Sequence, residues 1–107
     1  MSHLALYQQI DDLSAEVVSL IQEDKFDLVD EKLALRLSLM KEVTELVLSE
    51  HNETSKEQLR QFLLKCQQAD KQQVEHLLQE RTKVLETSQK QTKITQAVNA
   101  YQQVSGS

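Results

Sequence analysis

The sequence predicts an all-α protein, an antiparallel helical bundle or hairpin of three long helices followed by a short C-terminal helix that can detach. The 107 residues contain no proline and one glycine. The sequence therefore has almost none of the residues that form the many turns of a β-sheet protein. Only two tyrosines and two phenylalanines are aromatic, whereas the helix formers Leu, Gln, Glu and Lys are abundant. Apolar residues also recur at helical spacing, and we expect residues 1–107 to form a single helical domain.

The first helix is expected over about residues 3–22. Its apolar residues are spaced four and three apart, which places them on one face of a helix. They are Leu6, Ile10, Leu13, Val17 and Leu20. The charged run at 23–25 then interrupts the pattern, and Asp24 is a suitable N-cap for the next helix.

The second helix, expected over about residues 26–51, has two apolar stripes. The first contains Phe26, Val29, Leu33, Leu37, Met40, Val43 and Val47. The second, about 100° away around the helix, contains Leu28, Leu35, Leu39 and Leu46. Together they are wider than the face that a surface helix normally hides, so this helix either lies between two neighbours or offers a groove to a partner.

Arg36 is the polar exception within the first stripe. One interpretation is that its stem packs while its guanidinium pairs with a carboxylate of the first helix, such as Glu16. The other is that Arg36 is a polar anchor inside a binding groove.

The third helix is expected over about residues 55–88, after a turn at 51–55. Asn52 tolerates the left-handed conformation that ends a helix, and Thr54 and Ser55 each begin a possible capping box. A short turn between long helices predicts an antiparallel pair. The broad apolar face of this helix includes Leu59, Phe62, Leu63, Cys66, Val74, Leu77, Val84 and Leu85. Its middle, residues 65–73, is polar, so we expect weak packing there.

The C-terminal segment, expected as a helix over about residues 94–104, follows a weak joint at 86–93 that is rich in Thr, Ser and Gln. Its apolar residues are Ile94, Ala97, Val98, Tyr101 and Val104. A helix of about 11 residues is marginal alone in water, so the segment must dock on the body, dock on a partner, or fray. Tyr101 accordingly either packs on the bundle or is an aromatic contact that a partner buries.

Charge and hydropathy limit the classes of partner. The chain has 12 basic and 17 acidic residues, a net charge of −5, which disfavours binding to nucleic acid or anionic lipid. Residues 1–54 carry −8 and residues 55–107 carry +3, so the two halves attract one another when they pack antiparallel, unless these charges are simply solvated helix faces. No apolar run approaches the roughly 20 residues of a membrane span, and the first seven residues lack the features of a signal peptide. We therefore expect a cytoplasmic protein, with no membrane insertion, whose partners are proteins.

Catalytic and cofactor motifs are missing from the sequence. The histidines His3, His51 and His76 have no ligand partners at helical spacing, so we expect no metal and no other cofactor. A glycine-rich phosphate loop is also missing. Cys66 lies beside Phe62 on an apolar face, where it is expected to be a small buried side chain rather than a nucleophile. The sequence predicts a protein that is not an enzyme.

The sequence resembles the FliT-type flagellar export chaperones over nearly its whole length. The resemblance rests on the run from Glu23 to Val29 (EDKFDLV), followed by Arg36 and Leu39-Met40, and on the ending from Val98 to Val104 (VNAYQQV). In that family an aromatic–acidic pair opens a helix, with an arginine a couple of turns later. The family often has Gly-x-Trp where this chain has Asp24-Lys25-Phe26.

The resemblance implies an ATP-independent, cytoplasmic chaperone of flagellum assembly by type III protein export. Its partners would be the flagellar filament-cap protein, the export gate or export ATPase complex, and a flagellar transcription regulator. The cargo would bind an apolar helical surface, for which we expect Leu28, Leu35, Leu39, Leu46, Phe62 and Leu77. The residues expected in export-gate docking or in an autoinhibitory tail are Ile94, Val98, Tyr101 and Val104. Tyr101 matches the family tyrosine that docks at the gate.

Two other classes remain open. One is a structural or adaptor coiled-coil protein that forms a homodimer through the wide apolar face of the second helix. The other is a helical protein that binds a transcription regulator and has no role in secretion.

Overall fold

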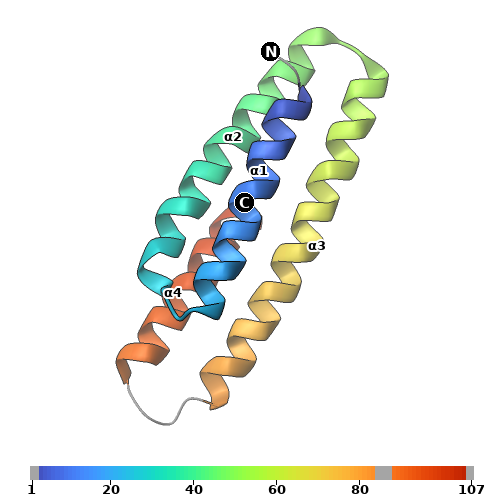
Figure 1. Cartoon of the computed structure of the whole chain (residues 1–107). Helices are drawn as coiled ribbons and strands as arrows, with labels where there is room; N and C mark the ends of the chain where they lie inside the picture. Colours follow the sequence, from blue (N-terminus) through green and yellow to red (C-terminus); the bar gives the residue numbers. More distant parts are fainter. Residues whose placement is uncertain (1–2, 84–87, 106–107) are drawn as a thin grey trace.

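The chain is an all-α helical bundle in a computed structural model that describes residues 3–83 and 88–105 (Figure 1). Within those ranges there are no strands. The helices are α1 (His3–Gln22), α2 (Val29–Glu50), α3 (Glu53–Lys83) and α4 (Ser88–Ser105), and a 3-10 turn, η1 (Phe26–Leu28), precedes α2. The prediction of an all-α helical bundle is confirmed.

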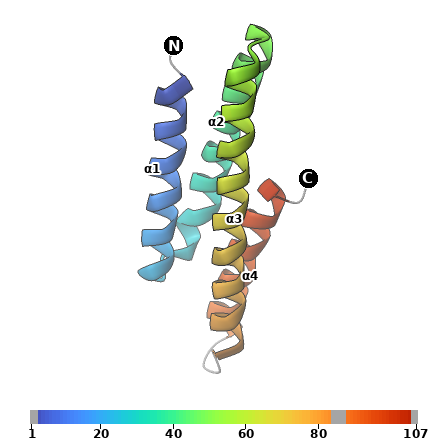
Figure 2. The same cartoon turned by 90° about the vertical axis from the view of Figure 1, so that its right-hand side faces the viewer.

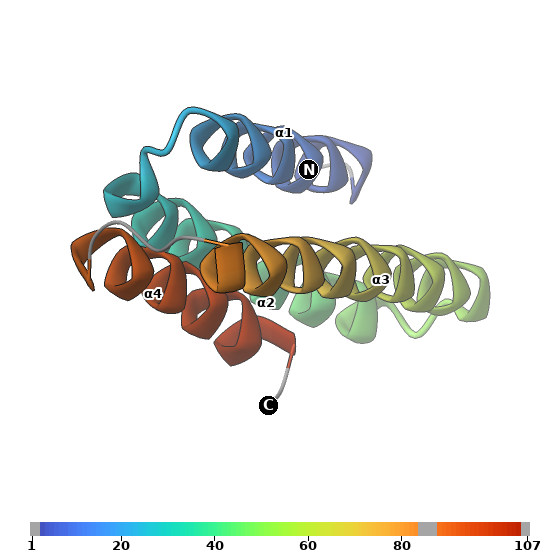
Figure 3. The same cartoon turned by 90° about the horizontal axis from the view of Figure 1, so that it is seen from below.

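Successive helices run antiparallel in an elongated body of 52 × 19 × 18 Å. The α2–α3 pair forms the middle of the body, and α1 and α4 lie on opposite sides of it (Figures 2 and 3). Because α4 is shorter than α3, it covers only the end of the bundle that contains the α1–α2 turn.

The turn after α1 differs from the prediction. Asp24 does not cap the second helix; it has a positive φ of 58° and ends the first one. The Lys25 N–H donates to the Leu20 carbonyl at 2.8 Å and the Asp24 N–H to the Ile21 carbonyl at 3.1 Å. These are the two hydrogen bonds of a Schellman motif, in which a short polar side chain tolerates the left-handed position. The predicted helix 26–51 therefore begins with η1 and ends at Glu50.

The turn before α3 also uses other residues than those predicted. The left-handed residue is His51, with φ 54°, rather than Asn52. The Asn52 side chain instead accepts a hydrogen bond from the Ser55 N–H at 3.1 Å, so Asn52 is the N-cap. As a result, α3 begins at Glu53, two residues before the predicted start.

The start of the C-terminal helix also differs from the prediction. The structure places α3 up to Lys83, whereas the predicted continuation over 84–87 lies outside the described residues, as does part of the predicted joint at 86–93. The rest of that joint is helical, because α4 begins at Ser88 rather than near Ile94.

The core consists of two clusters of buried apolar side chains. The cluster at the α4 end, here called the α4 cluster, contains Val17, Ile21, Phe26, Val29, Leu33, Leu77, Ile94, Ala97, Val98 and Tyr101. The cluster at the other end, here called the distal cluster, contains Leu6, Ile10, Met40, Val43, Val47, Leu59 and Cys66. Arg36 and Asp70, both buried, lie along their helices between the residues of the two clusters.

Candidate functional site

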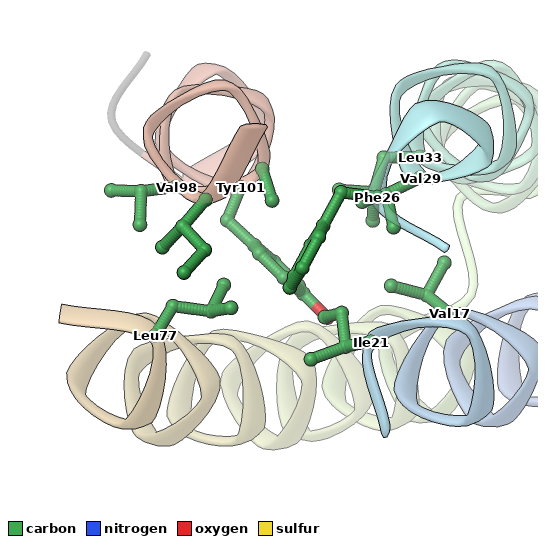
Figure 4. Packing of buried hydrophobic residues seen from close by; sticks show 10 residues of the cluster. Val17, Ile21, Phe26, Val29, Leu33, Leu77, Val98 and Tyr101 are labelled. Carbon is green, nitrogen blue, oxygen red and sulfur yellow. The ribbon is translucent and has the colours of Figure 1, made fainter. Parts of the chain in front are cut away.

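The C-terminal helix is docked on the body. Ile94, Ala97, Val98 and Tyr101 project from one face of α4 into the α4 cluster and are at most 4% exposed. Figure 4 shows Tyr101 beside Phe26, and Val98 on the side of Leu77 of α3. Of the three outcomes expected for this segment, the structure shows docking on the body.

The predicted tail residues are thus core residues in this conformation. Ile94, Val98 and Tyr101 are buried, and the side chain of Val104 lies outside the described part of the chain. A contact between Tyr101 and another protein is not accessible while α4 is docked, because only 2% of Tyr101 is exposed.

Two parallel ion pairs hold the first turns of α4. The Lys90 Nζ lies 3.2 Å from an Asp24 carboxylate oxygen, and the Lys93 Nζ lies 3.1 Å from one of Asp27. Both lysines come from the basic half of the sequence and both aspartates from the acidic half. The charge of the two halves predicts their attraction, but it does not single out these four residues. A usable signal was that the two lysines are three residues apart in the sequence, as are the two aspartates. Residues three apart on a helix lie on one face.

A surface groove lies on either side of α4. A groove of about 380 Å³ lies between α2 and α4, lined by residues such as Leu33, Leu37 and Ala100. A second, of about 270 Å³, includes Leu77 of α3, Lys90 and Ile94 in its lining.

A buried ion pair joins the helices between the two clusters. Arg36 Nη1 donates to one carboxylate oxygen of Asp70 at 3.0 Å, and Nη2 donates to the other. Nη1 also donates to the hydroxyl of Ser14 in α1 at 3.0 Å, and that hydroxyl donates to the Ile10 carbonyl. Arg36 Nε is buried, and no group of the described residues accepts a hydrogen bond from it.

This pairing corrects two predictions. Arg36 pairs with Asp70 of α3 rather than with Glu16 of α1, which instead lies 3.1 Å from the Lys32 Nζ. The middle of α3 is also not merely a weakly packed polar stretch, because Cys66 and Asp70 are both buried there.

Tyr101 connects α4 to the same ion pair. Burial is the main cause that raises the pKa of Tyr101, the negative charge of Asp70 raises it further, and the positive charge of Arg36 lowers it. Both charges therefore lie close enough to act on the Tyr101 hydroxyl.

The residues predicted as one cargo surface fall into three environments. Leu28 and Leu35 are exposed, at 45% and 50%, whereas Leu39 and Leu46 are half-buried against the distal cluster. The other two predicted residues, in α3, are not on that face. Phe62 stacks on Tyr7 with ring centroids 4.3 Å apart. Leu77 is fully buried under α4. These six residues therefore do not share one exposed face, because periodicity places residues on helix faces without showing which neighbour covers each face.

Burial also sets the chemistry of Cys66, which is 7% exposed. Desolvation is the main cause that raises the pKa of its thiol to about 11. We expect Ellman's reagent at pH 8 to label the native protein far more slowly than the urea-unfolded protein, because only the thiolate reacts. Equal labelling rates would contradict the burial of Cys66.

The raised pKa of Cys66 makes the stability of the protein depend on pH at high pH. The folded state holds the thiol proton more tightly than the unfolded state, so this contribution to stability is complete below about pH 8.5 and is lost as the pH rises toward 11. Urea unfolding gives the free energy of unfolding at pH 8 and at pH 10.5. The decrease between these two pH values should be smaller for Cys66→Ala than for the unaltered chain. An identical loss in both proteins would contradict this assignment.

Comparisons of the chain with protein-family models, with curated proteins and with solved structures find no match. Among the described helices, none combines the length and apolar character needed to cross a membrane. Within residues 3–83 and 88–105, no three His, Cys, Asp or Glu side chains are grouped so that they could hold a metal ion.

Proposed function

We propose that this protein is a cytoplasmic chaperone that binds an amphipathic helix of its cargo in the place that α4 occupies. The observation that carries the proposal is the docking of α4: an amphipathic helix at the end of the chain fills an apolar site formed by α2, α3 and η1. Binding of an amphipathic helix in an apolar groove is a common mode of peptide recognition. In this chain α4 is the internal occupant, and a cargo helix is its competitor.

The resemblance to FliT-type chaperones gives the proposal its particular form. The cargo is the C-terminal helical segment of the flagellar filament-cap protein, and delivery is to the type III export gate or its ATPase complex. One structural detail supports the resemblance. Position 24 has the left-handed conformation that glycine adopts without strain, and the family often has glycine there.

The order of events follows from burial. Cargo binding at the α4 cluster displaces α4, and the release of α4 exposes Tyr101, which is buried while α4 is docked. Contact of Tyr101 with the export gate is therefore possible only for a chaperone whose α4 has left the body. Such a chaperone needs no catalytic group or cofactor.

The test uses the lysines of α4, because changing them loosens α4 and leaves the apolar site on α2, α3 and η1 unchanged. The double variant Lys90→Gln/Lys93→Gln removes both ion pairs with the α1–α2 turn. The apparent affinity of a site rises with the fraction of molecules in which it is open. We expect this variant to bind a peptide of the filament-cap protein's C-terminal segment several-fold more tightly in calorimetry, and removal of residues 88–107 to give a larger increase.

A matched control is available at the other end of the molecule. Lys56→Gln/Arg60→Gln also removes two exposed cations that pair with carboxylates three residues earlier, but these lie at the start of α3. The control should bind as the unaltered chain does. Unchanged affinity in the α4 variants, or an equal increase in the control, would contradict autoinhibition by α4, and a lack of binding by all of them would contradict the proposed cargo.

A further inference from the structure

One flank of η1 and α2 carries a second apolar surface, part of which is exposed while α4 is docked. It is formed by Leu28, Leu35, Leu39 and Leu46, here called the leucine stripe. Their spacings of seven, four and seven keep them on one line along about 27 Å of helix. Leu28 and Leu35 are 45% and 50% exposed, whereas Leu39 and Leu46 are half-buried against the distal cluster.

A row of carboxylates follows the stripe along one side. Glu31 and Glu42 lie about 40–60° from the stripe around the helix, and Glu45 lies somewhat further away. All three are exposed, and no basic side chain of the described part of the chain pairs with them. By contrast, Lys32, on the other side of the stripe, is already paired with Glu16 of α1. The free charge beside the stripe is therefore negative.

A second copy of this chain fits that surface poorly. The spacing of the four leucines is the same in both directions, so two antiparallel copies would match Leu28 with Leu46 and Leu35 with Leu39. In that register, the twofold symmetry places Glu31 of one copy near Glu42 of the other, on the same side of the interface. Two such pairs of like charges oppose association through this face.

The molecule already contains one example of the complementary chemistry. α4 has no acidic residue, presents one apolar face, and places two lysines against Asp24 and Asp27. An acidic edge beside an apolar surface thus holds a basic amphipathic helix within this fold.

We propose that the leucine stripe and its carboxylate row form a docking surface for a basic amphipathic helix of a partner protein. The partner helix lays its apolar face on the leucines and directs lysine or arginine side chains to Glu31, Glu42 and Glu45. This surface is separate from the site under α4, so its use does not depend on the displacement of α4.

The experiment measures binding of a fluorescent 18-residue amphipathic peptide of leucine and lysine by anisotropy. We expect Leu35→Ser and Glu31→Gln/Glu42→Gln each to weaken binding about five-fold, because each removes part of a contact made by an exposed group. Binding should also weaken between 50 and 300 mM salt. A peptide of the same pattern with glutamate in place of lysine should not bind.

Two control variants and the α4 variant locate the peptide. Leu48→Ser changes an exposed leucine outside the stripe, and Glu53→Gln/Glu57→Gln removes two exposed carboxylates of α3, so both should bind as the unaltered chain does. Lys90→Gln/Lys93→Gln should leave the affinity unchanged. Tighter binding by that variant would place the peptide under α4 and overturn the proposal. The proposal would also be overturned if the peptide did not bind, or if the controls weakened binding as much as the stripe variants do. A homodimer in sedimentation that depends on the leucine stripe would overturn it as well.

Discussion

Replacing Arg36 with methionine should lower the free energy of unfolding by about 3–5 kcal/mol, because it leaves the carboxylate of Asp70 buried without its partner. Arg36 and Asp70 are 1% and 4% exposed, so water reaches neither group. The single change Asp70→Leu should be equally destabilising, since it leaves the guanidinium buried with only the Ser14 hydroxyl as acceptor. Urea unfolding followed by circular dichroism measures both changes.

The double variant Arg36→Met/Asp70→Leu should recover most of that loss. Replacing both members of a buried ion pair by apolar side chains is often neutral or stabilising, because the cost of desolvating two charges disappears. Here the replacement also removes the Arg36 Nε, which is buried and donates to no group of the described residues. If the two single losses simply added in the double variant, the two side chains would not be acting as a pair.

Replacing Tyr101 with alanine should weaken the docking of α4 by about 3–5 kcal/mol, the usual cost of deleting a buried aromatic side chain. Tyr101 is 2% exposed and contributes the largest side chain of α4 to the α4 cluster. Because its loss acts on α4 rather than on the distal cluster, circular dichroism should show a loss of helix no larger than α4, with the rest of the unfolding transition retained.

Two control variants test whether the ring of Tyr101 is what holds α4 to the body. Tyr101→Phe keeps the ring and its apolar contacts, so it should cost much less than Tyr101→Ala. Gln102→Ala, an exposed neighbour on α4, should have no measurable effect. If Tyr101→Ala were as mild as Tyr101→Phe, the ring of Tyr101 would not be what holds α4 to the body.

The helices could be predicted from the sequence because their signals are local. The bounds of α1 and the buried stripe of α2 follow from apolar periodicity that is uninterrupted for several turns. The turn residues were harder to predict. Asp24, Asn52 and His51 all tolerate caps or left-handed positions, and the choice among them depends on where the flanking helices meet.

The buried ion pair could not be predicted in the same way. Arg36 and Asp70 are 34 residues apart, and each looks like an interruption of its own apolar face. Their pairing is determined by the relative register of α2 and α3, which no local pattern encodes. The burial of Leu77 was missed for a related reason: periodicity assigned it to an apolar face, but the docking of α4 determines that this part of the face is covered.

Native-state hydrogen exchange tests most directly the claim that α4 is a separable occupant of the body. The amides from Ile94 to Tyr101 should exchange together through an opening that costs less free energy than global unfolding, while those of Val43 and Val47 should exchange only on global unfolding. Lys90→Gln/Lys93→Gln should lower the opening free energy of the α4 amides and leave the α2 amides unchanged. If the amides of α4 and α2 shared one opening free energy in both proteins, α4 would be an inseparable part of the core, and exchange with a cargo helix would be contradicted.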